Sequence, residues 1–166
     1  MSSATELPTW PRAVELFQKM LYHFYRRSDR PRAIPYGLKL LRALHHLDPR
    51  AASIPGNEYR AVIAELDEDL ADAIRYRLRE IRLYEKLIRR GQLESSQLTW
   101  DRYADRYDLL AALYMDAREW DKACAAIRKS ERICQEHEIP FDGEALKADI
   151  ATARETAADG SKAKTA

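Results

Sequence analysis

A chain of 166 residues has the usual length of one domain, and a helical domain of this length can bury its apolar side chains in one core. Charged residues make up 33% of the chain and hydrophobic residues 46%, with only 5 Gly, which excludes a disordered chain and a turn-rich β-sandwich and favours helix. The formal net charge of +1 excludes a long-range field that would draw the protein to nucleic acid or to an anionic membrane.

The N-terminal residues give no sign of export or membrane insertion. Met1–Leu7 lacks a basic segment followed by an apolar run, and no stretch of about 18 apolar residues occurs anywhere in the sequence. We therefore expect a cytoplasmic protein with no membrane partner.

The first two predicted helices form a hairpin. Pro11 suits a first helical turn, and apolar residues then recur at spacings of three and four until about Arg27. After a short break, Pro35 can open a second helix, which ends at Asp48.

The third predicted helix is the longest. Asn57 suits an N-cap position, and an apolar stripe keeps one helical phase from there to Arg90. The continuous stripe favours one long helix over two short ones, although it leaves open a kink near Asp67 to Asp69. Its first half carries acidic residues that are interpreted as a solvated face, namely Glu65, Asp67, Glu68, Asp69 and Asp72.

A second hairpin and a last helix complete the chain. Thr99 suits an N-cap position, and two apolar stripes on either side of a turn at 116–119 predict two helices. Asp142 can cap the last helix, which is followed by a small, polar segment. We expect a single helical domain over residues 1–158 and a disordered C-terminal tail over residues 159–166.

The segment from Tyr107 to Ser130 carries a characteristic spacing of large, small and aromatic residues. They fall where two antiparallel helices touch, namely Tyr107, Leu110, Ala111 and Tyr114, then Ala123, Ile127 and Ser130. This segment resembles a tetratricopeptide repeat. The first hairpin resembles a degenerate copy, in which Gly37 lies 13 positions after Phe24 whereas Ala123 lies 9 after Tyr114. The alternative is an ordinary helical bundle, because regular arrays normally hold three or more repeats.

These patterns together predict an all-α fold. The resemblance implies antiparallel helical hairpins in a TPR-like α-α superhelix, with one long central helix and about six helices in all. It also implies a module that binds other proteins.

The sequence contains few residues in patterns typical of catalysis or metal binding. The four histidines and two cysteines show no metal-binding spacing, and Cys124 and Cys134 lie about 15 Å apart along one predicted helix. No dinucleotide-binding, phosphate-loop or nucleophile motif occurs. We therefore expect no enzyme activity, no catalytic residue, no metal site and no cofactor.

The long predicted helix carries a basic stripe in its second half. Its members project within about 80° of one another at ~100° per residue. They are Arg75, Arg79, Arg82, Lys86 and Arg90. A solvated helix face is one interpretation, and a surface for an anionic peptide or an RNA phosphate strand is the other.

Arg77 falls in the apolar arc of the same helix, between Ile74 and Ile81. A buried guanidinium must be paired. Its partner is either an acidic residue on a neighbouring helix, which would make Arg77 structural, or a ligand in a groove that Arg77 lines.

The expected function is a non-enzymatic adaptor or scaffold that binds a peptide or a partner helix in a helical groove. Arg77 and the basic stripe are its candidate binding residues, and another protein or peptide is its expected partner. The alternative is an RNA- or phosphate-binding protein that uses the basic stripe, although the near-zero net charge disfavours nucleic acid.

Overall fold

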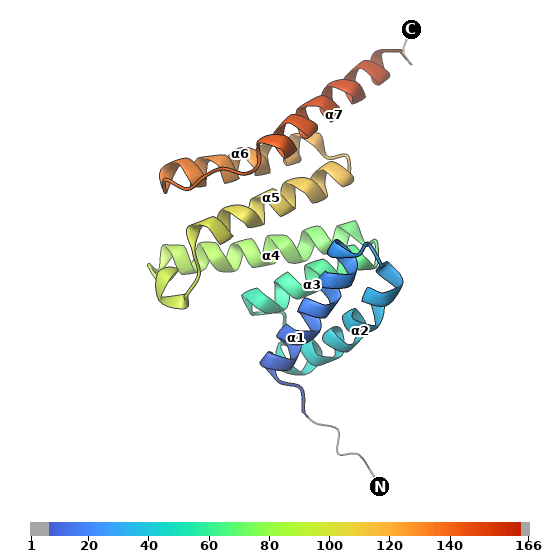
Figure 1. Ribbon diagram of the computed structural model, residues 1–166. Helices are drawn as coiled ribbons and strands as arrows, with labels where there is room; N and C mark the ends of the chain where they lie inside the picture. Colours follow the sequence, from blue (N-terminus) through green and yellow to red (C-terminus); the bar gives the residue numbers. More distant parts are fainter. Residues whose placement is uncertain (1–6, 164–166) are drawn as a thin grey trace. The chain divides into compact units, whose positions relative to one another are not determined.

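All regular structure is helical over the residues that the computed structural model describes, 7–163 (Figure 1). No strand occurs in this range, which confirms the predicted all-α class, and no helix within it is long and apolar enough to cross a membrane. The α-helices are α1 (Trp10–Leu21), α2 (Arg30–Leu47), α3 (Ile54–Leu66), α4 (Leu70–Arg89), α5 (Trp100–Asp116), α6 (Trp120–Glu136) and α7 (Glu144–Ala163). A π-helical turn, η1 (Tyr22–Arg26), follows α1, and a 3₁₀ turn, η2 (Glu94–Ser96), follows α4.

The chain divides into two compact units. The N-terminal unit ends at Tyr76 and the C-terminal unit starts at Arg77, so the continuous helix α4 contributes to both. The predicted single domain over residues 1–158 stays a prediction.

The N-terminal unit is built on the hairpin of α1 and α2, with α3 packed against α2. The rings of Phe17 and Tyr59 stack with centroids 4.1 Å apart. A Cβ at Gly37 would come within 3.1 Å of Leu66 and 3.3 Å of Met20, so a small residue is needed where these helices meet. The largest fully buried apolar side chains of this unit are Met20, Leu40, Leu44 and Leu66.

Helix α2 begins earlier than predicted. It starts at Arg30 rather than Pro35 because Asp29 caps it, accepting a hydrogen bond from the backbone N–H of Arg32 at 3.2 Å. Pro31 occupies the first turn, where a missing N–H leaves no intrahelical bond unmade. Pro35 lies inside the helix and forfeits one backbone hydrogen bond.

The predicted single long helix from Asn57 to Arg90 is wrong. The described residues hold seven α-helices, consistent with the prediction of about six. The break lies at 67–69, where the sequence also allows a kink. Glu68 adopts φ +61°, a left-handed conformation outside the α-helix. Asp69 then caps α4, because its Oδ1 accepts a hydrogen bond from the N–H of Asp72 at 3.0 Å. The apolar stripe continues in phase across the break and therefore did not reveal it.

The C-terminal unit contains the predicted second hairpin, in which α5 and α6 pack along each other. Ala111 and Ala123 are both fully buried, as expected of small residues where two helices approach closely. Helix α4 ends at Arg89, and Gly91 follows with a φ of +63° that suits glycine; the N–H of Gln92 donates to the carbonyl of Leu87 at 2.9 Å.

Helix α7 packs on α6 and then continues past it (Figure 1). Residues 159–163 are helical, so the predicted disordered tail is wrong for these residues, and residues 164–166 lie outside the described residues. Every side chain from Arg154 to Lys162 is exposed. This half of α7 therefore extends from the unit with little tertiary packing of its own.

Candidate interaction surfaces

Arg77 belongs to a buried ion network rather than to a groove. It is 1% exposed, and its Nη1 donates to Oε2 of Glu80, which is fully buried, at 2.6 Å. Nη1 of Arg106 on α5 donates to the other oxygen, Oε1, at 2.9 Å. One acidic partner of Arg77 therefore lies one turn along α4 itself, and that acid is shared with Arg106 from the neighbouring helix α5. Arg77 ties α4 to α5 through Glu80 and offers no surface to a ligand.

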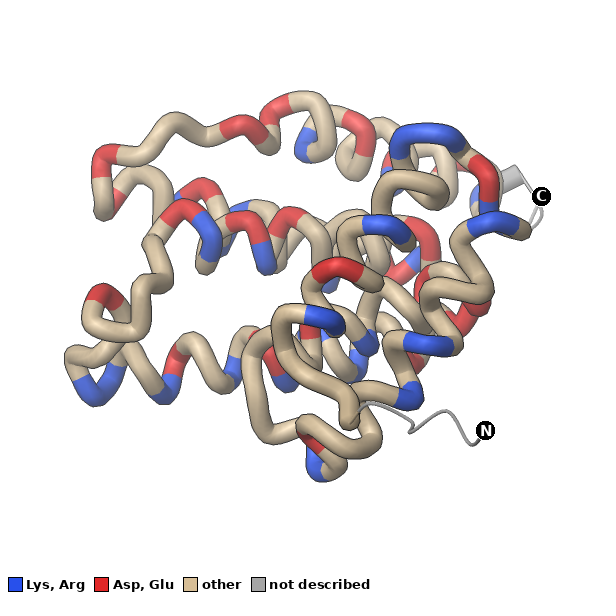
Figure 2. The backbone as a smooth tube through the Cα atoms, turned by 60° about the horizontal axis from the view of Figure 1, so that its bottom comes forward, with Lys and Arg blue, Asp and Glu red and all other residues tan. Residues whose placement is uncertain are grey.

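The basic stripe is exposed along α4. In the N-terminal unit, Arg75 pairs with Asp72 at 2.9 Å and lies over the ring of Tyr76 at 5.0 Å. The stripe residues in the C-terminal unit also have exposed side chains, namely Arg79, Arg82, Lys86 and Arg90. Figure 2 shows acidic segments interspersed with basic ones along the helices of both units. The stripe is thus accessible but lies in a field of mixed charge.

The two tyrosines of α4, Tyr76 and Tyr84, expose little ring surface on which a nucleic-acid base could stack. Tyr84 is fully buried and stacks on Tyr103 with centroids 5.7 Å apart. One face of Tyr76 is covered by Arg75. The stripe therefore offers cations for phosphate groups, whereas the ring of Tyr84 and one face of Tyr76 are already occupied by other side chains.

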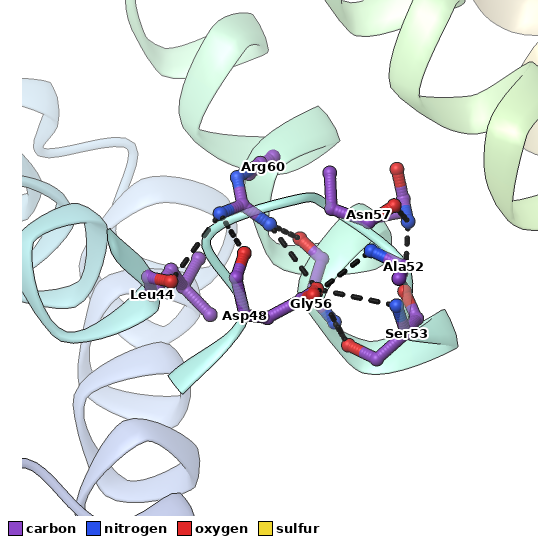
Figure 3. A network of polar contacts seen from close by, with 8 residues as sticks. Leu44, Asp48, Ala52, Ser53, Gly56, Asn57 and Arg60 are labelled. Carbon is purple, nitrogen blue, oxygen red and sulfur yellow. Dashed lines mark hydrogen bonds and ion pairs between the residues drawn. The ribbon is translucent and has the colours of Figure 1, made fainter. Parts of the chain in front are cut away.

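A second buried network, centred on Asp48 and Arg60, joins α2 to α3 (Figure 3). Asp48 accepts hydrogen bonds from the N–H of Ala52 at 2.8 Å and the hydroxyl of Ser53 at 2.7 Å. Arg60 donates to the carboxylate of Asp48 at 3.3 Å, to its carbonyl at 2.6 Å and to the carbonyl of Leu44 at 3.4 Å. Burial would raise the pKa of Asp48, but the hydrogen bonds from Ser53 and Ala52 and the charge of Arg60 hold it below its usual value.

The same network sets the start of α3. Ser53, rather than Asn57 as predicted, is the N-cap, and its hydroxyl accepts from the N–H of Gly56 at 3.0 Å. Asn57 is fully buried, and its Nδ2 donates to the carbonyls of Ala51 and Ser53 at 2.7 and 2.8 Å (Figure 3). Asp48 was predicted only as a helix end and Arg60 was not singled out, because neither motif nor spacing reveals which arginine turns inward.

A cavity of about 150 Å³ opens beside the break between α3 and α4. We call it the acidic pocket. It lies wholly within the N-terminal unit and combines apolar side chains with carboxylates. Its lining consists of Leu41 from α2, then Arg60, Ile63 and Ala64 from α3, and Asp67, Asp69, Asp72 and Tyr76 from the break and α4.

A larger and more open hollow of about 530 Å³ lies in the C-terminal unit. We call it the terminal hollow. It is lined by residues 118–122 at the start of α6 and by Arg154, Ala157 and Ala158 of α7. Two ion pairs cross or border it, Lys122 with Glu119 and Arg154 with Asp121, the latter at 2.9 Å. Its charges are therefore largely matched to one another.

Carboxylates also crowd one side of α5. Burial raises the pKa of Asp108; the hydroxyl of Ser130 opposes this rise, and the charges of Asp105 and Asp142 add to it. Burial likewise raises the pKa of Asp105, against the charge of Arg106. Across residues 7–163, no three His, Cys, Asp or Glu side chains form a group that could hold a metal ion.

The chain matches no protein-family model, no curated protein and no solved structure. The resemblance of the second hairpin to a tetratricopeptide repeat therefore stays a prediction that rests on its own residues.

Proposed function

We propose that the protein is a non-enzymatic interaction module that binds a peptide or a partner helix of another protein. The observation that carries this proposal is the terminal hollow, an open concave surface between two helices of the C-terminal unit. Such surfaces are where amphipathic helices and peptides dock on helical proteins. The repeat-like spacing of α5 and α6 supports the same role.

The exposed half of α7 gives a physical reason for a partner. Helical segments of this length are marginal in water unless tertiary packing supports them. Ala157 and Ala158 line the hollow on this half of the helix, and Trp120 faces the same space from α6. A partner seated in the hollow would cover these residues and supply the packing that α7 lacks.

Filling the hollow tests the proposal. Ala157 is exposed and lines the hollow, so Ala157→Arg should place a bulky charged side chain in it while leaving the helix intact. Ala151 is also exposed on α7 but does not line the hollow, so Ala151→Arg is the matched control.

Immobilised full-length protein should retain a partner from an extract, identified by mass spectrometry, with wild type and Ala151→Arg but not with Ala157→Arg. All three proteins should share one melting midpoint. Equal retention by Ala157→Arg would show that the hollow is not the binding surface.

The exposed basic stripe supports a second candidate function, in which the protein binds RNA or another phosphate-bearing ligand. Binding of a fluorescent single-stranded RNA oligonucleotide should then weaken steeply between about 50 and 200 mM salt. Arg82→Ala and Lys86→Ala should each reduce the slope of log affinity against log salt by about one. Binding that is absent at low salt excludes this candidate. This candidate comes second because Tyr84 is buried and Arg75 covers one face of Tyr76, which leaves the stripe little aromatic surface for bases.

A further inference from the structure

The acidic pocket has more negative charge at its mouth than the neighbouring cations neutralise. Arg60 lines the pocket, but its guanidinium is held by Asp48 and by backbone carbonyls. Asp72 pairs with Arg75 at 2.9 Å. Asp67 and Asp69 take part in no ion pair with any other residue of the described range 7–163. Their charges therefore remain available to a ligand.

The helix ends add to this potential. Asp67 is the C-cap of α3, and the last turn of α3 carries no basic residue. The unpaired carbonyls at a helix C-terminus hold partial negative charge, so a carboxylate is unfavourable there and a cation is stabilised. Asp69, by contrast, is explained by its role as the N-cap of α4. Arg30 from α2 donates to the carbonyl of Leu66 at 2.7 Å and pairs with Glu68 at 3.1 Å. It thus serves the end of α3 but forms no ion pair with the carboxylate of Asp67, which a bound cation can still neutralise.

The geometry indicates a cation larger than a metal ion. No three acidic, His or Cys side chains between residues 7 and 163 converge closely enough to hold a metal. The carboxylates instead surround a cavity of about 150 Å³, a volume that in other proteins accepts a group the size of benzene. Its inner lining is apolar, from Leu41, Ile63 and Ala64. A ligand that fits must therefore carry both an aliphatic stem and a positive charge.

We propose that the acidic pocket binds a lysine side chain presented by a basic segment of a partner protein. The methylene stem lies against Leu41 and Ile63, and the ammonium group meets Asp67, Asp69 and Asp72 at the mouth. An ammonium with three rotatable donors suits carboxylates placed around a rim, whereas the planar fork of arginine suits a single coplanar carboxylate. One face of Tyr76 is already covered by the guanidinium of Arg75, which leaves less of this ring for stacking by an arginine ligand. This inference extends the proposed interaction role to the N-terminal unit and does not depend on the terminal hollow.

Short peptides with one variable side chain test the pocket directly. The probes are pentapeptides with a central lysine between two pairs of glycines and with both ends blocked. Matched probes carry arginine, norleucine or diaminopropionic acid at the centre. Each is titrated into ¹⁵N-labelled full-length protein, and the amide shifts of residues 63–76 are followed.

The lysine probe should shift these amides in a saturable way. Norleucine, which lacks the charge, should not bind, and arginine should bind more weakly than lysine. Diaminopropionic acid keeps the charge but loses most of the stem, so its affinity should fall by about tenfold because less apolar surface is buried. Equal affinity for lysine and diaminopropionic acid would reduce the pocket to a diffuse negative surface. Tighter binding of arginine would overturn the assignment of lysine.

Charge-neutralising variants give an independent arm. Asp67→Asn with Asp69→Asn removes two carboxylates while an asparagine at 69 can still cap α4, and it should weaken lysine binding by about tenfold. Asp149→Asn with Glu155→Gln removes the same charge from exposed positions of α7 and should change nothing. Equal loss in both double variants would refute the pocket. If the lysine probe fails while Ala157→Arg still abolishes partner capture, the inference about the acidic pocket is wrong and the proposed function stands. If the lysine probe binds while Ala157→Arg captures the partner as wild type does, the acidic pocket stands and the terminal hollow is not the binding surface.

Discussion

Glu80 is the residue on which the fold of the C-terminal unit should depend most strongly. It is fully buried, and its two carboxylate oxygens accept from Arg77 at 2.6 Å and from Arg106 at 2.9 Å. Replacing Glu80 with alanine removes the acid that Arg77 and Arg106 share. Arg77→Ala, by comparison, leaves Glu80 paired with Arg106. The two substitutions therefore differ in what they leave buried.

The expected magnitudes follow from that difference. Breaking a buried ion pair costs about 3 to 5 kcal/mol. Glu80→Ala should fall at the upper end of this range because two guanidinium groups lose their shared carboxylate. Arg77→Ala should cost about 2 kcal/mol, because the carboxylate of Glu80 stays paired with Arg106 when Arg77 is removed. At roughly 2 to 4 °C per kcal/mol for a chain of this size, a difference of about 3 kcal/mol should separate the two melting midpoints by about 6 to 12 °C.

Urea denaturation and thermal scans measure the stabilities of these proteins, which should decrease from wild type to Arg77→Ala to Glu80→Ala. Glu155→Ala, at an exposed position on α7, is the control and should match wild type. Replacing Arg77, Glu80 and Arg106 together by apolar residues of similar shape should leave the free energy of unfolding nearly unchanged, because the desolvation of all three charges is then avoided. An Arg77→Ala variant as unstable as Glu80→Ala would show that Glu80 does not hold both arginines. A variant of Arg77 that is fully stable would show that its side chain reaches solvent.

Three further predictions concern the other helix contacts. The pKa of Asp48 is held below its usual value of 3.8, so the stability that this carboxylate provides is complete above about pH 4 and is lost as the pH falls through the lower pKa of the folded state. Asp48→Asn should therefore be less stable than wild type at pH 7, and its melting midpoint should fall less than that of wild type as the pH is lowered from 7 to 2. An equal fall of the melting midpoint in both proteins would contradict the network. A Cβ at Gly56 would overlap the carboxylate of Asp48, so Gly56→Ala should lower stability by about 3 kcal/mol, whereas Gly160→Ala has open space and should be neutral or slightly stabilising. Ala123→Leu should overpack the hairpin by about 1 to 3 kcal/mol while Ala125→Leu, at an exposed position, should not, and equal midpoints would argue against a close crossing at Ala123.

Helices with one amphipathic face were predictable from the sequence because their signal is local. The second hairpin was found near its observed bounds, since Thr99 precedes α5 and two apolar stripes flank a short turn. The burial of Arg77 followed from helical phase alone. The break after Leu66 was not predictable in this way, because the apolar phase continues across it. It depends instead on which of several adjacent acids caps the next helix, and Asp69 does so.

The candidate sites depended on contacts that no local pattern encodes. Arg60 reaches Asp48 across 12 positions, and only the close approach of α2 and α3 makes the pair. Asp67 and Asp69 were interpreted as part of a solvated helix face because one continuous helix was expected there. With the helix broken, the same residues surround a pocket whose apolar side comes partly from Leu41 on another helix. A wrong boundary of three residues thus concealed the pocket.

The two buried ion networks have a common structural effect. Arg60 donates to the carbonyls of Leu44 in the last turn of α2 and of the C-cap residue Asp48, and so fixes α3 against the end of α2. Glu80 fixes α4 against α5 in the same manner. Buried pairs of this kind contribute little net stability relative to apolar residues of the same shape, but they are costly to break, so they favour one register of the helices over its alternatives. With the register set from inside, carboxylates at the acidic pocket and alanines at the terminal hollow are free of that structural task. Asp67→Asn at the acidic pocket and Ala157→Arg at the terminal hollow should therefore leave the melting midpoint within about 2 °C of wild type, and a binding defect in either variant would report a lost contact rather than a lost fold.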